Sequence, residues 1–432
     1  MTAIPWPDRA PDATAAGTLP LRPFRAVRYD IERIGNLAAV LGPPDDVPDA
    51  AQAAALAARH PYHCLHLEIP DPDGRGFTQA AQQYRTWRSE GVLLREREPA
   101  CYVYAHRFRL DGTPSERLGV FLAAALDPLA GAQLLPHEGT TPELVERRLR
   151  QLEAVQAHAG AVYAIWAGDG ALRQVLEAIV HTELPLWSVT VNGDEHRLWA
   201  VSGARAHELA ALVTSRPLVI ADGHHRYAAA QRLAERARVG GRSGDPRGWV
   251  PVHVVDAADP ALVVRPIHRV LSWLPCDWDT LRAHLARHAA VDSLAPRPLD
   301  GVVQLASDLA RSRRPHVLVL HRQELLVVEL PTGADSEPDA VVVDRLLLRH
   351  VCALDAATIE RVVTYTPDTS EAVAAVQSGR AVLAVLLRPT PLATVLALAQ
   401  AGQLLPPKTT YFFPKLPQGI VFYDLADPLT LG

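Results

Sequence analysis

From about residue 21 onward, hydrophobic residues occur alternately in short dense runs and at a helical spacing. The dense runs predict strands and the helical spacing predicts helices. The predicted strands are 21–30, 63–69 and 100–110, and the predicted helices are 49–60 and 77–91. Alternation of this kind favours an α/β or α+β architecture.

A second cycle of the same pattern fills the middle of the chain. It starts with the apolar run 117–126 and continues through a predicted helix at 141–160. Thr141 before Pro142 is a good pair for the N-cap and first positions of that helix. Three predicted strands follow, at 161–166, 186–191 and 196–202.

The last part of the chain predicts a smaller lobe. Residues 250–255 and 261–271 resemble a pair of strands around the turn 256–260. Beyond Trp278 we expect, in order, a helix, a hairpin, a helix and a strand, at 278–289, 316–330, 340–353 and 380–389. Because the length allows two or three domains, we predict a tail at 1–20, a core at 21–276 and a C-terminal α/β lobe at 277–432.

Composition excludes several classes of protein. The chain of 432 residues is 48% hydrophobic and 21% charged, and its net charge of −5 comes without a long block of one sign, so nucleic acid is not an expected partner. The four cysteines are far apart and form no C-x-x-C pair, which indicates neither a zinc knuckle nor a disulfide framework. No run reaches the roughly 18 apolar residues that span a bilayer. The N-terminus lacks the apolar region of a signal peptide. We expect a soluble cytoplasmic protein.

One short segment, Asp222-Gly223-His224-His225-Arg226, stands where a predicted strand meets a predicted helix. A helix N-terminus binds phosphate through free backbone N–H groups, glycine permits close approach, and arginine adds a bidentate contact. The histidines can donate to phosphate oxygens, and the aspartate is suited to acid, base or metal chemistry. The alternative is that Asp222 caps the helix and the next three side chains are solvated.

Two further segments carry candidate chemistry. Pro136-His137-Glu138 precedes a predicted helix, where a carboxylate and an imidazole are suited to holding Mg²⁺ or deprotonating a hydroxyl; the alternative is a polar loop. In 406–422, Lys408, Thr409, Thr410 and Lys415 alternate with aromatic residues, as in a segment that closes over a phosphate. The alternative there is a proline-rich surface strap.

Two weaker candidates complete the set. Asp45 and Asp46 follow a double proline, and His268 and Arg269 stand in a strand-like run. Neighbouring residues of a strand point to opposite faces, so at most one of His268 and Arg269 lines the same site.

Taken in order, these segments resemble the family called domain of unknown function 1015, over about Leu21 to Phe422. The resemblance is carried by residues 21–28, 42–47, 134–140, 162–166, 196–201, 220–230, 265–270 and 407–422. Its most specific parts are the Asp-Gly-His-His-Arg motif and the Lys-Thr-Thr-Tyr-Phe-Phe-Pro-Lys stretch. That family looks related to the ParB/sulfiredoxin-like fold, and the motif is similar to that of the free-serine kinases of that fold, which use ADP or ATP and Mg²⁺.

The resemblance implies roles for individual residues. Asp222, His224, His225 and Arg226 would form the phosphate and transfer site. Glu138 is the candidate general base or magnesium ligand, ahead of Glu68 and Asp46. The expected set is catalytic Glu138, Asp222 and His225, nucleotide-binding His137, Gly223, His224, His225, Arg226, Lys408 and Thr409, and metal-binding Glu138 and Asp222.

Three departures from the family's pattern concern the acceptor. Asp45 stands where the family has tyrosine, Gly139 replaces a basic residue after His-Glu, and an Ala-Asn-x-Ser-Pro segment has become 157–161, Ala-His-Ala-Gly-Ala. These changes remove side chains suited to contacting an acceptor, so a kinase for a different small acceptor stays open.

The leading hypothesis is a nucleotide-dependent small-molecule kinase that phosphorylates free serine, a related hydroxy amino acid or a biosynthetic intermediate. Its partners would be the nucleotide and a small hydroxylated substrate, with no nucleic acid and no membrane; the oligomeric state, a homodimer included, stays open. The alternatives are a nucleotide-binding ParB-like regulator and a metal-dependent hydrolase. Sulfiredoxin-type repair is disfavoured because His224 occupies the place of the required cysteine.

Overall fold

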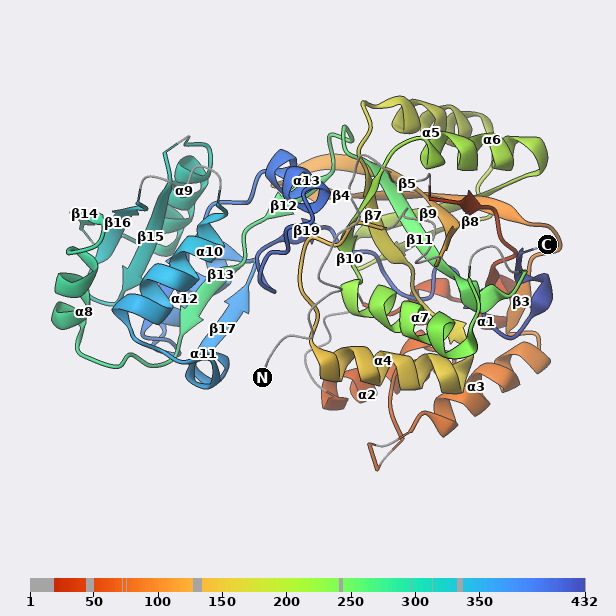
Figure 1. Cartoon of the computed structure of the whole chain (residues 1–432), viewed down its shortest axis with the longest axis horizontal. Helices are drawn as coiled ribbons and strands as arrows, with labels where there is room; N and C mark the ends of the chain where they lie inside the picture. The colour runs from red at the N-terminus through yellow and green to blue at the C-terminus, as the bar shows by residue number, and fades with distance from the viewer. Residues whose placement is uncertain are drawn as a thin grey trace. The chain divides into compact units, whose positions relative to one another are not determined.

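The computed structural model of this chain describes residues 19–43, 50–71, 73–74, 76–126, 134–240, 244–295, 297–312, 314–331 and 337–431. It is a mixed α/β protein with several β-sheets, as the hydrophobic pattern predicts (Figure 1). Among the described helices, none combines the length and apolar character needed to cross a bilayer.

The chain forms two compact units. Unit 1 comprises 1–262, 398–404 and 414–432, and unit 2 comprises 263–397 and 405–413. The crossing at Leu262 precedes the predicted boundary at residue 276, and the chain returns to unit 1 at its C-terminal end. The C-terminal segment 406–422 is therefore shared between the units.

Unit 1 is built on a large sheet with the strand order β10-β7-β11-β5-β4-β9-β8, and β1 pairs with β5. Only β11 and β7 run parallel among these pairs. The strands are β1 (Leu21–Arg22), β4 (Ala100–Leu110), β5 (Thr113–Ala125), β7 (Val162–Trp166), β8 (Trp187–Val191), β9 (Asp194–Ser202), β10 (Leu218–Asp222) and β11 (Trp249–Asp256). Two small ladders pair β2 (Val27–Tyr29) with β3 (Leu93–Arg95), and β6 (Ala157–His158) with β20 (Tyr423–Asp424).

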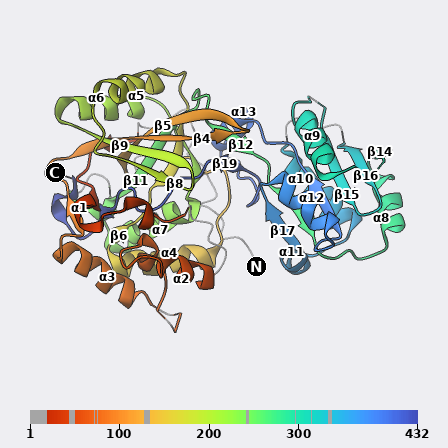
Figure 2. The ribbon, with the colours of Figure 1, turned by 180° about the vertical axis from the view of Figure 1, so that it is seen from behind.

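Helices cover both faces of this sheet, which has a hydrophobic cluster on each side. The cluster with Val103, Val120 and Val252 includes the apolar faces of α5 (Ala171–Thr182) and α6 (Gly203–Thr214). Both views show these two helices together on one side of the sheet (Figures 1 and 2). The other cluster includes α3 and α4, and α7 contributes to both. The remaining helical elements of unit 1 are α1 (Ile31–Ile34), α2 (Ala50–Ala57), α3 (Thr78–Ser89), α4 (Pro142–Val155), α7 (His224–Ala237), η1 (Leu37–Ala39), η2 (Cys64–Leu67), η3 (Pro246–Gly248) and η6 (Pro428–Leu431).

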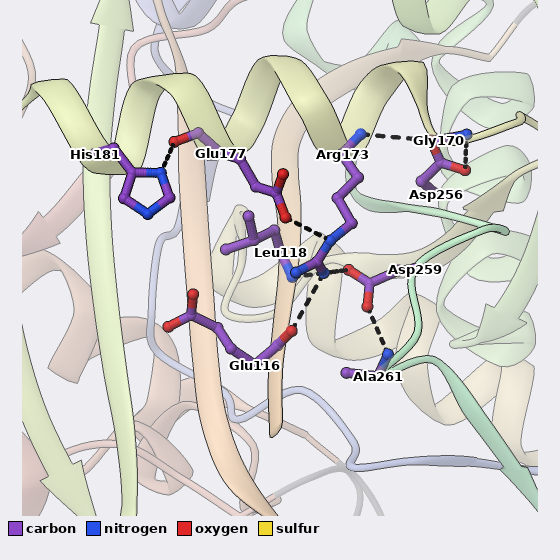
Figure 3. Close-up of polar contacts among 9 residues, drawn as sticks. All are labelled: Glu116, Leu118, Gly170, Arg173, Glu177, His181, Asp256, Asp259 and Ala261. Carbon is purple, nitrogen blue, oxygen red and sulfur yellow. Dashed lines mark hydrogen bonds and ion pairs between the residues drawn. The ribbon is translucent and has the colours of Figure 1, made fainter. Parts of the chain in front are cut away.

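Two aspartates at and just after the end of β11 attach α5 to the sheet. Asp256 accepts from the backbone N–H of Gly170 at 3.1 Å and thereby satisfies a donor at the start of α5. Asp259 accepts from Arg173 Nη1 at 2.5 Å and from the backbone N–H of Leu118 at 3.1 Å. Figure 3 shows the whole network, which joins β5, β11 and α5 through charge-assisted hydrogen bonds.

Unit 2 contains an antiparallel sheet with the order β14-β16-β15-β18-β13-β17, and a two-stranded ladder of β12 and β19. Its strands are β12 (Val263–Arg265), β13 (His268–Leu271), β14 (Ala290–Leu294), β15 (His316–His321), β16 (Leu325–Glu329), β17 (Val363–Thr366), β18 (Leu383–Leu386) and β19 (Tyr411–Phe413). Its helices are α8 (Trp278–Leu285), α9 (Leu299–Ala310), α10 (Asp339–Val343), the π-helix η5 (Asp344–Val351), α11 (Ala356–Val362) and α12 (Thr369–Gln377). The helix α13 (Leu392–Gln400) begins in unit 2, and its last residues belong to unit 1.

Most of the elements predicted from the pattern are confirmed, including the strand at 100–110 and the hairpin at 316–330. The strand predicted at 63–69 is wrong, because this segment is the 3₁₀ helix η2. There, the His63 side chain accepts from the Leu65 N–H at 3.2 Å and so caps a helical turn. The predicted pairing of 250–255 with 261–271 is also wrong, since both edges of β11 are occupied by β5 and β7.

Candidate functional site

The motif stands at the junction of β10 and α7, and its glycine is required there. Gly223 is the N-cap of α7 with φ of 91°, a conformation that L side chains rarely adopt. A Cβ on this residue would lie 3.3 Å from the Cα of Val162. No side chain caps the helix, so the interpretation of Asp222 as a helix cap is wrong.

The motif side chains are not a solvated first turn. His224 and Arg226 are each 8% exposed, and His225 is half-buried. Burial of polar groups is costly unless they have partners. The alternative of an ordinary polar helix start is therefore wrong for His224 and Arg226.

The partners of the two histidines come from the loop that carries Glu138. The backbone N–H groups of His137 and Glu138 both point to His224 Nε2, at 3.4 Å each, and the N–H of Thr141 donates to His225 Nε2 at 3.0 Å. Because both Nε2 atoms accept, the proton of each neutral ring is on Nδ1. The histidines thus fasten the start of α7 to the start of α4.

The loop itself is held against β10. Leu135 forms a parallel bridge with Val219, and His137 Nδ1 donates to the Ile220 carbonyl at 2.6 Å. His137 is fully buried, whereas the Glu138 side chain is 16% exposed, with Oε1 3.7 Å from His137 Nε2. The interpretation of this segment as an ordinary polar loop is therefore wrong for His137, which is buried.

Burial determines the charge state of these imidazoles. It lowers the pKa of His224 well below its usual value, and the neighbouring His137, His225 and Lys415 lower it further. The pKa of His137 is also lowered, again mainly by burial. At neutral pH both rings are uncharged, so they act through hydrogen bonds.

Arg226 lies directly beside the motif glycine. Its Nη1 donates to the Ala161 carbonyl, and a Cβ on Gly223 would lie 3.4 Å from the same nitrogen. Gly160 leaves room on the other side, because a Cβ there would lie 3.4 Å from the guanidinium carbon. Burial lowers the pKa of Arg226 to about 10, so the group stays cationic at neutral pH.

The C-terminal segment reaches the motif through Lys415. Its Nζ lies 3.0 Å from Asp222 Oδ1, with the lysine side chain 9% exposed and the aspartate side chain 28% exposed. The Gly419 N–H donates to the Ala159 carbonyl at 2.9 Å, which holds the segment beside 157–161. Lys415 was noted in the sequence but not included in the expected nucleotide-binding set.

The other predicted residues are placed elsewhere. Lys408 and Thr409 belong to unit 2, where the Lys408 carbonyl accepts from Arg269 Nη1 at 3.2 Å, and their nucleotide-binding role stays a prediction. Asp45 and Asp46 lie outside the described residues. His268 is bonded to Thr369 Oγ1 at 2.9 Å, and Arg269 is paired with Asp344 at 2.8 Å.

Glu68, the second-choice acid, lies on a small cavity that the motif residue Arg226 also lines. Its carboxylate pairs with Arg148, which also donates to Gln151 Oε1 at 2.9 Å. These side chains line a small polar cavity together with His158 and Arg226. The Glu68 carboxylate is thus engaged by a guanidinium.

No group of three or more His, Cys, Asp and Glu side chains within the described ranges is arranged to hold a metal ion. Asp222 and Glu138 each carry a carboxylate, which is the kind of ligand that Mg²⁺ takes, and Asp222 is paired with Lys415.

His158 makes the stability of unit 1 sensitive to acid. Burial, followed by the charge of Arg148, lowers the pKa of His158 to about 3. The unfolded chain, with a histidine pKa of about 6.5, binds the proton first, so stability is lost as pH falls below 6.5. Between pH 7.5 and 5.5, His158 should cost about 1.4 kcal/mol of unfolding free energy.

Urea unfolding at both pH values tests this. His158→Asn should reduce the difference between them by that amount, while His207→Asn, at an exposed position on α6, should leave it unchanged. Equal pH dependence in wild type and His158→Asn would contradict the prediction.

One protein family matches most of this chain. The model of the family DUF1015, described as a protein of unknown function, matches residues 21–357. The chain belongs to the DUF1015 family. The predicted membership is confirmed, and the matched part of this DUF1015 chain contains both the motif and Glu138.

Solved structures similar to this DUF1015 chain are distant. A conserved hypothetical protein from Pyrococcus furiosus is 14% identical, with 69% of this chain and 93% of that chain covered and a TM-score of 0.37. A free serine kinase in complex with AMP is 14% identical, with 71% and 91% covered and a TM-score of 0.39. SbnI with a C-terminal truncation, from Staphylococcus aureus, is 12% identical, with 70% and 86% covered and a TM-score of 0.36. Comparison with curated proteins returned no match.

Proposed function

We propose that this chain is a nucleotide-dependent kinase that phosphorylates a hydroxyl of a small molecule, either free serine, a related hydroxy amino acid or a biosynthetic intermediate. One observation carries the proposal: His224 and His225, at the uncapped start of α7, accept backbone hydrogen bonds from the loop that bears Glu138. These hydrogen bonds hold a helix start that is suited to binding an anion next to a loop whose carboxylate is suited to act as a base. Phosphoryl transfer requires this combination of charge neutralisation and positioning.

The donor nucleotide, ATP or ADP, binds with its terminal phosphates at the start of α7. Gly223 allows close approach to the backbone N–H groups, and the helix dipole favours negative charge. The neutral rings of His224 and His225 donate from Nδ1, while Arg226 and Lys415 add positive charge.

Glu138 acts as the general base in the transfer step. Its carboxylate takes the proton of the acceptor hydroxyl as the hydroxyl oxygen forms a bond to the terminal phosphorus. The bond from that phosphorus to the bridging oxygen breaks, and the shortened nucleotide leaves with the electron pair. Arg226 and Lys415 neutralise the charge on the leaving phosphate. Asp222 and Glu138 would hold Mg²⁺, which when bound screens the phosphate charges.

We also propose that the region around the motif is a ParB/sulfiredoxin-like core at 21–276, followed by a C-terminal lobe at 277–432. This assignment rests on the resemblance of the Asp-Gly-His-His-Arg motif.

Incubation of the purified chain with ATP or ADP, Mg²⁺ and a panel of hydroxy amino acids tests the activity. Mass spectrometry should detect an acceptor heavier by one phosphoryl group, together with the shortened nucleotide in equal amount. Samples without acceptor separate transfer from simple hydrolysis of the nucleotide. If the protein binds neither nucleotide and phosphorylates no acceptor, the proposed function is wrong.

A further inference from the structure

Arg117 is a buried cation whose anionic partner is not among the described residues. The residue is 1% exposed, and Nε, Nη1 and Nη2 are all buried without a hydrogen-bond partner within the described ranges. Buried polar groups in native proteins are almost always paired. An uncompensated buried charge is strongly destabilising. The side chain therefore has the character of one half of an ion pair whose other half is a ligand.

This guanidinium lies on the sheet face that leads to the motif. Its carbon atom is 5.0 Å from the ring centroid of Tyr163 on β7. The register places Tyr163 opposite Asp222 on one side and His253 on the other. Because Tyr163 is on the strand next to β10 and adjacent strands are about 4.8 Å apart, the Arg117 guanidinium is on the order of 10 Å from the motif strand.

His253 adds a second unpaired polar group to the same face. It is fully buried, and neither Nδ1 nor Nε2 has a hydrogen-bond partner among the described residues. Its ring crosses β5 at Gly119, where a Cβ would lie only 2.3 Å from Nε2. Gly119 is two residues from Arg117 on the same face of the strand. Burial and then the charge of Arg117 lower the pKa of His253, so the ring is neutral and has one N–H to donate.

A guanidinium and a neutral imidazole in a dry environment are suited to a carboxylate. The planar fork of arginine binds both oxygens of a carboxylate with two parallel hydrogen bonds, and the imidazole supplies a third. The separation of roughly 10 Å from the motif strand fits a small acceptor, because it leaves a few bonds between hydroxyl and carboxylate and a hydrogen bond of about 3 Å at each end.

We propose that Arg117, assisted by His253, binds the carboxylate of the acceptor, so that the acceptor is a hydroxy acid or hydroxy amino acid with its hydroxyl directed toward the motif. This inference rests on the proposed kinase function and specifies the chemical class of its acceptor. Removal of Arg117 should weaken acceptor binding and leave nucleotide binding intact.

Arg117→Met tests the assignment, because methionine keeps an unbranched side chain and removes the charge. The KM of a carboxylate-bearing acceptor should rise about 10- to 100-fold, the loss expected for a charged hydrogen-bonded pair, while the Kd of ADP stays within about twofold. The amino alcohol that lacks the carboxylate should show no such difference between wild type and variant. Arg109→Met, at an exposed position on β4, is the matched control. An unchanged KM in a folded Arg117→Met variant overturns the inference.

Thermal unfolding separates this inference from the kinase proposal. L-serine and malonate should raise the Tm of the wild-type chain but not that of Arg117→Met, even if no phosphorylation is found. If ADP raises the wild-type Tm and neither carboxylate does, the Arg117 site is wrong while the nucleotide site stands. If inorganic phosphate replaces carboxylate as the stabilising anion at Arg117, the acceptor class is wrong. Arg117→Lys, which keeps the charge, provides a second variant if Arg117→Met does not fold.

Discussion

Glu138→Gln is expected to lower kcat for phosphoryl transfer by about 10²- to 10⁴-fold, the usual contribution of a general base. The substitution keeps the size and shape of the side chain and removes its negative charge and its ability to take a proton. The Glu138 backbone N–H still points to His224 Nε2, so the start of α7 keeps its form. The Kd of the nucleotide should therefore change only a few-fold. Steady-state kinetics together with calorimetric titration of ADP measure both quantities.

Glu143→Gln is the control for this experiment. Glu143 is an exposed acid in the first turn of α4, only five positions further along. Its removal should leave kcat unchanged. If Glu138→Gln retains wild-type kcat, the base is another acid, and Glu68→Gln becomes the next variant to measure.

Arg226→Ala is expected to lower nucleotide affinity by about 10- to 100-fold and also to destabilise unit 1. The variant loses a cation that is 8% exposed and lies beside Gly223, so a charge-assisted contact to phosphate is lost. It also leaves the Ala161 carbonyl without its donor, which should reduce the unfolding free energy by about 1–3 kcal/mol. Calorimetric titration and urea unfolding separate the two effects.

Two variants show whether Arg226 binds phosphate or only supports the loop. Arg226→Lys keeps the charge and loses the planar fork, so affinity should fall less than in Arg226→Ala. Arg232→Ala removes a surface cation from the same helix that is 3.8 Å from Glu146, and should change neither affinity nor stability appreciably. A folded Arg226→Ala chain with wild-type nucleotide affinity would rule out the proposed role.

Local chemistry made part of the site predictable. Glycine between a strand and a helix indicates a junction with positive φ, and Gly223 has it. The pattern Thr141-Pro142 indicates a helix start, and α4 begins at Pro142. At 63–69 the hydrophobic spacing predicted a strand, which is wrong. The His63 side chain accepts from the nearby backbone N–H of Leu65 and so favours the 3₁₀ helix η2.

Long-range partners were not predictable from the same signals. Lys415 pairs with Asp222 across almost two hundred residues of chain, and Glu68 pairs with Arg148 across eighty residues. Neither pairing leaves a local signature, because ion pairs depend on which strands and loops the fold brings together. The crossing of the chain into unit 2 and back, which separates Lys408 from Lys415, is of the same kind.

The sequence by itself determined the mixed α/β class, the family and the place of the motif between a strand and a helix, since these depend on residue type and spacing along short stretches of the chain. Only the tertiary structure decided that His224 and His225 are fastened to the Glu138 loop, that Asp222 is paired rather than capping, and that Arg117 is buried without a partner. The burial of a side chain and its partners depend on which helices, strands and loops pack together in the fold. The motif, for which a helix cap was the alternative, thus has two histidines at the start of α7 that accept hydrogen bonds from the loop carrying Glu138.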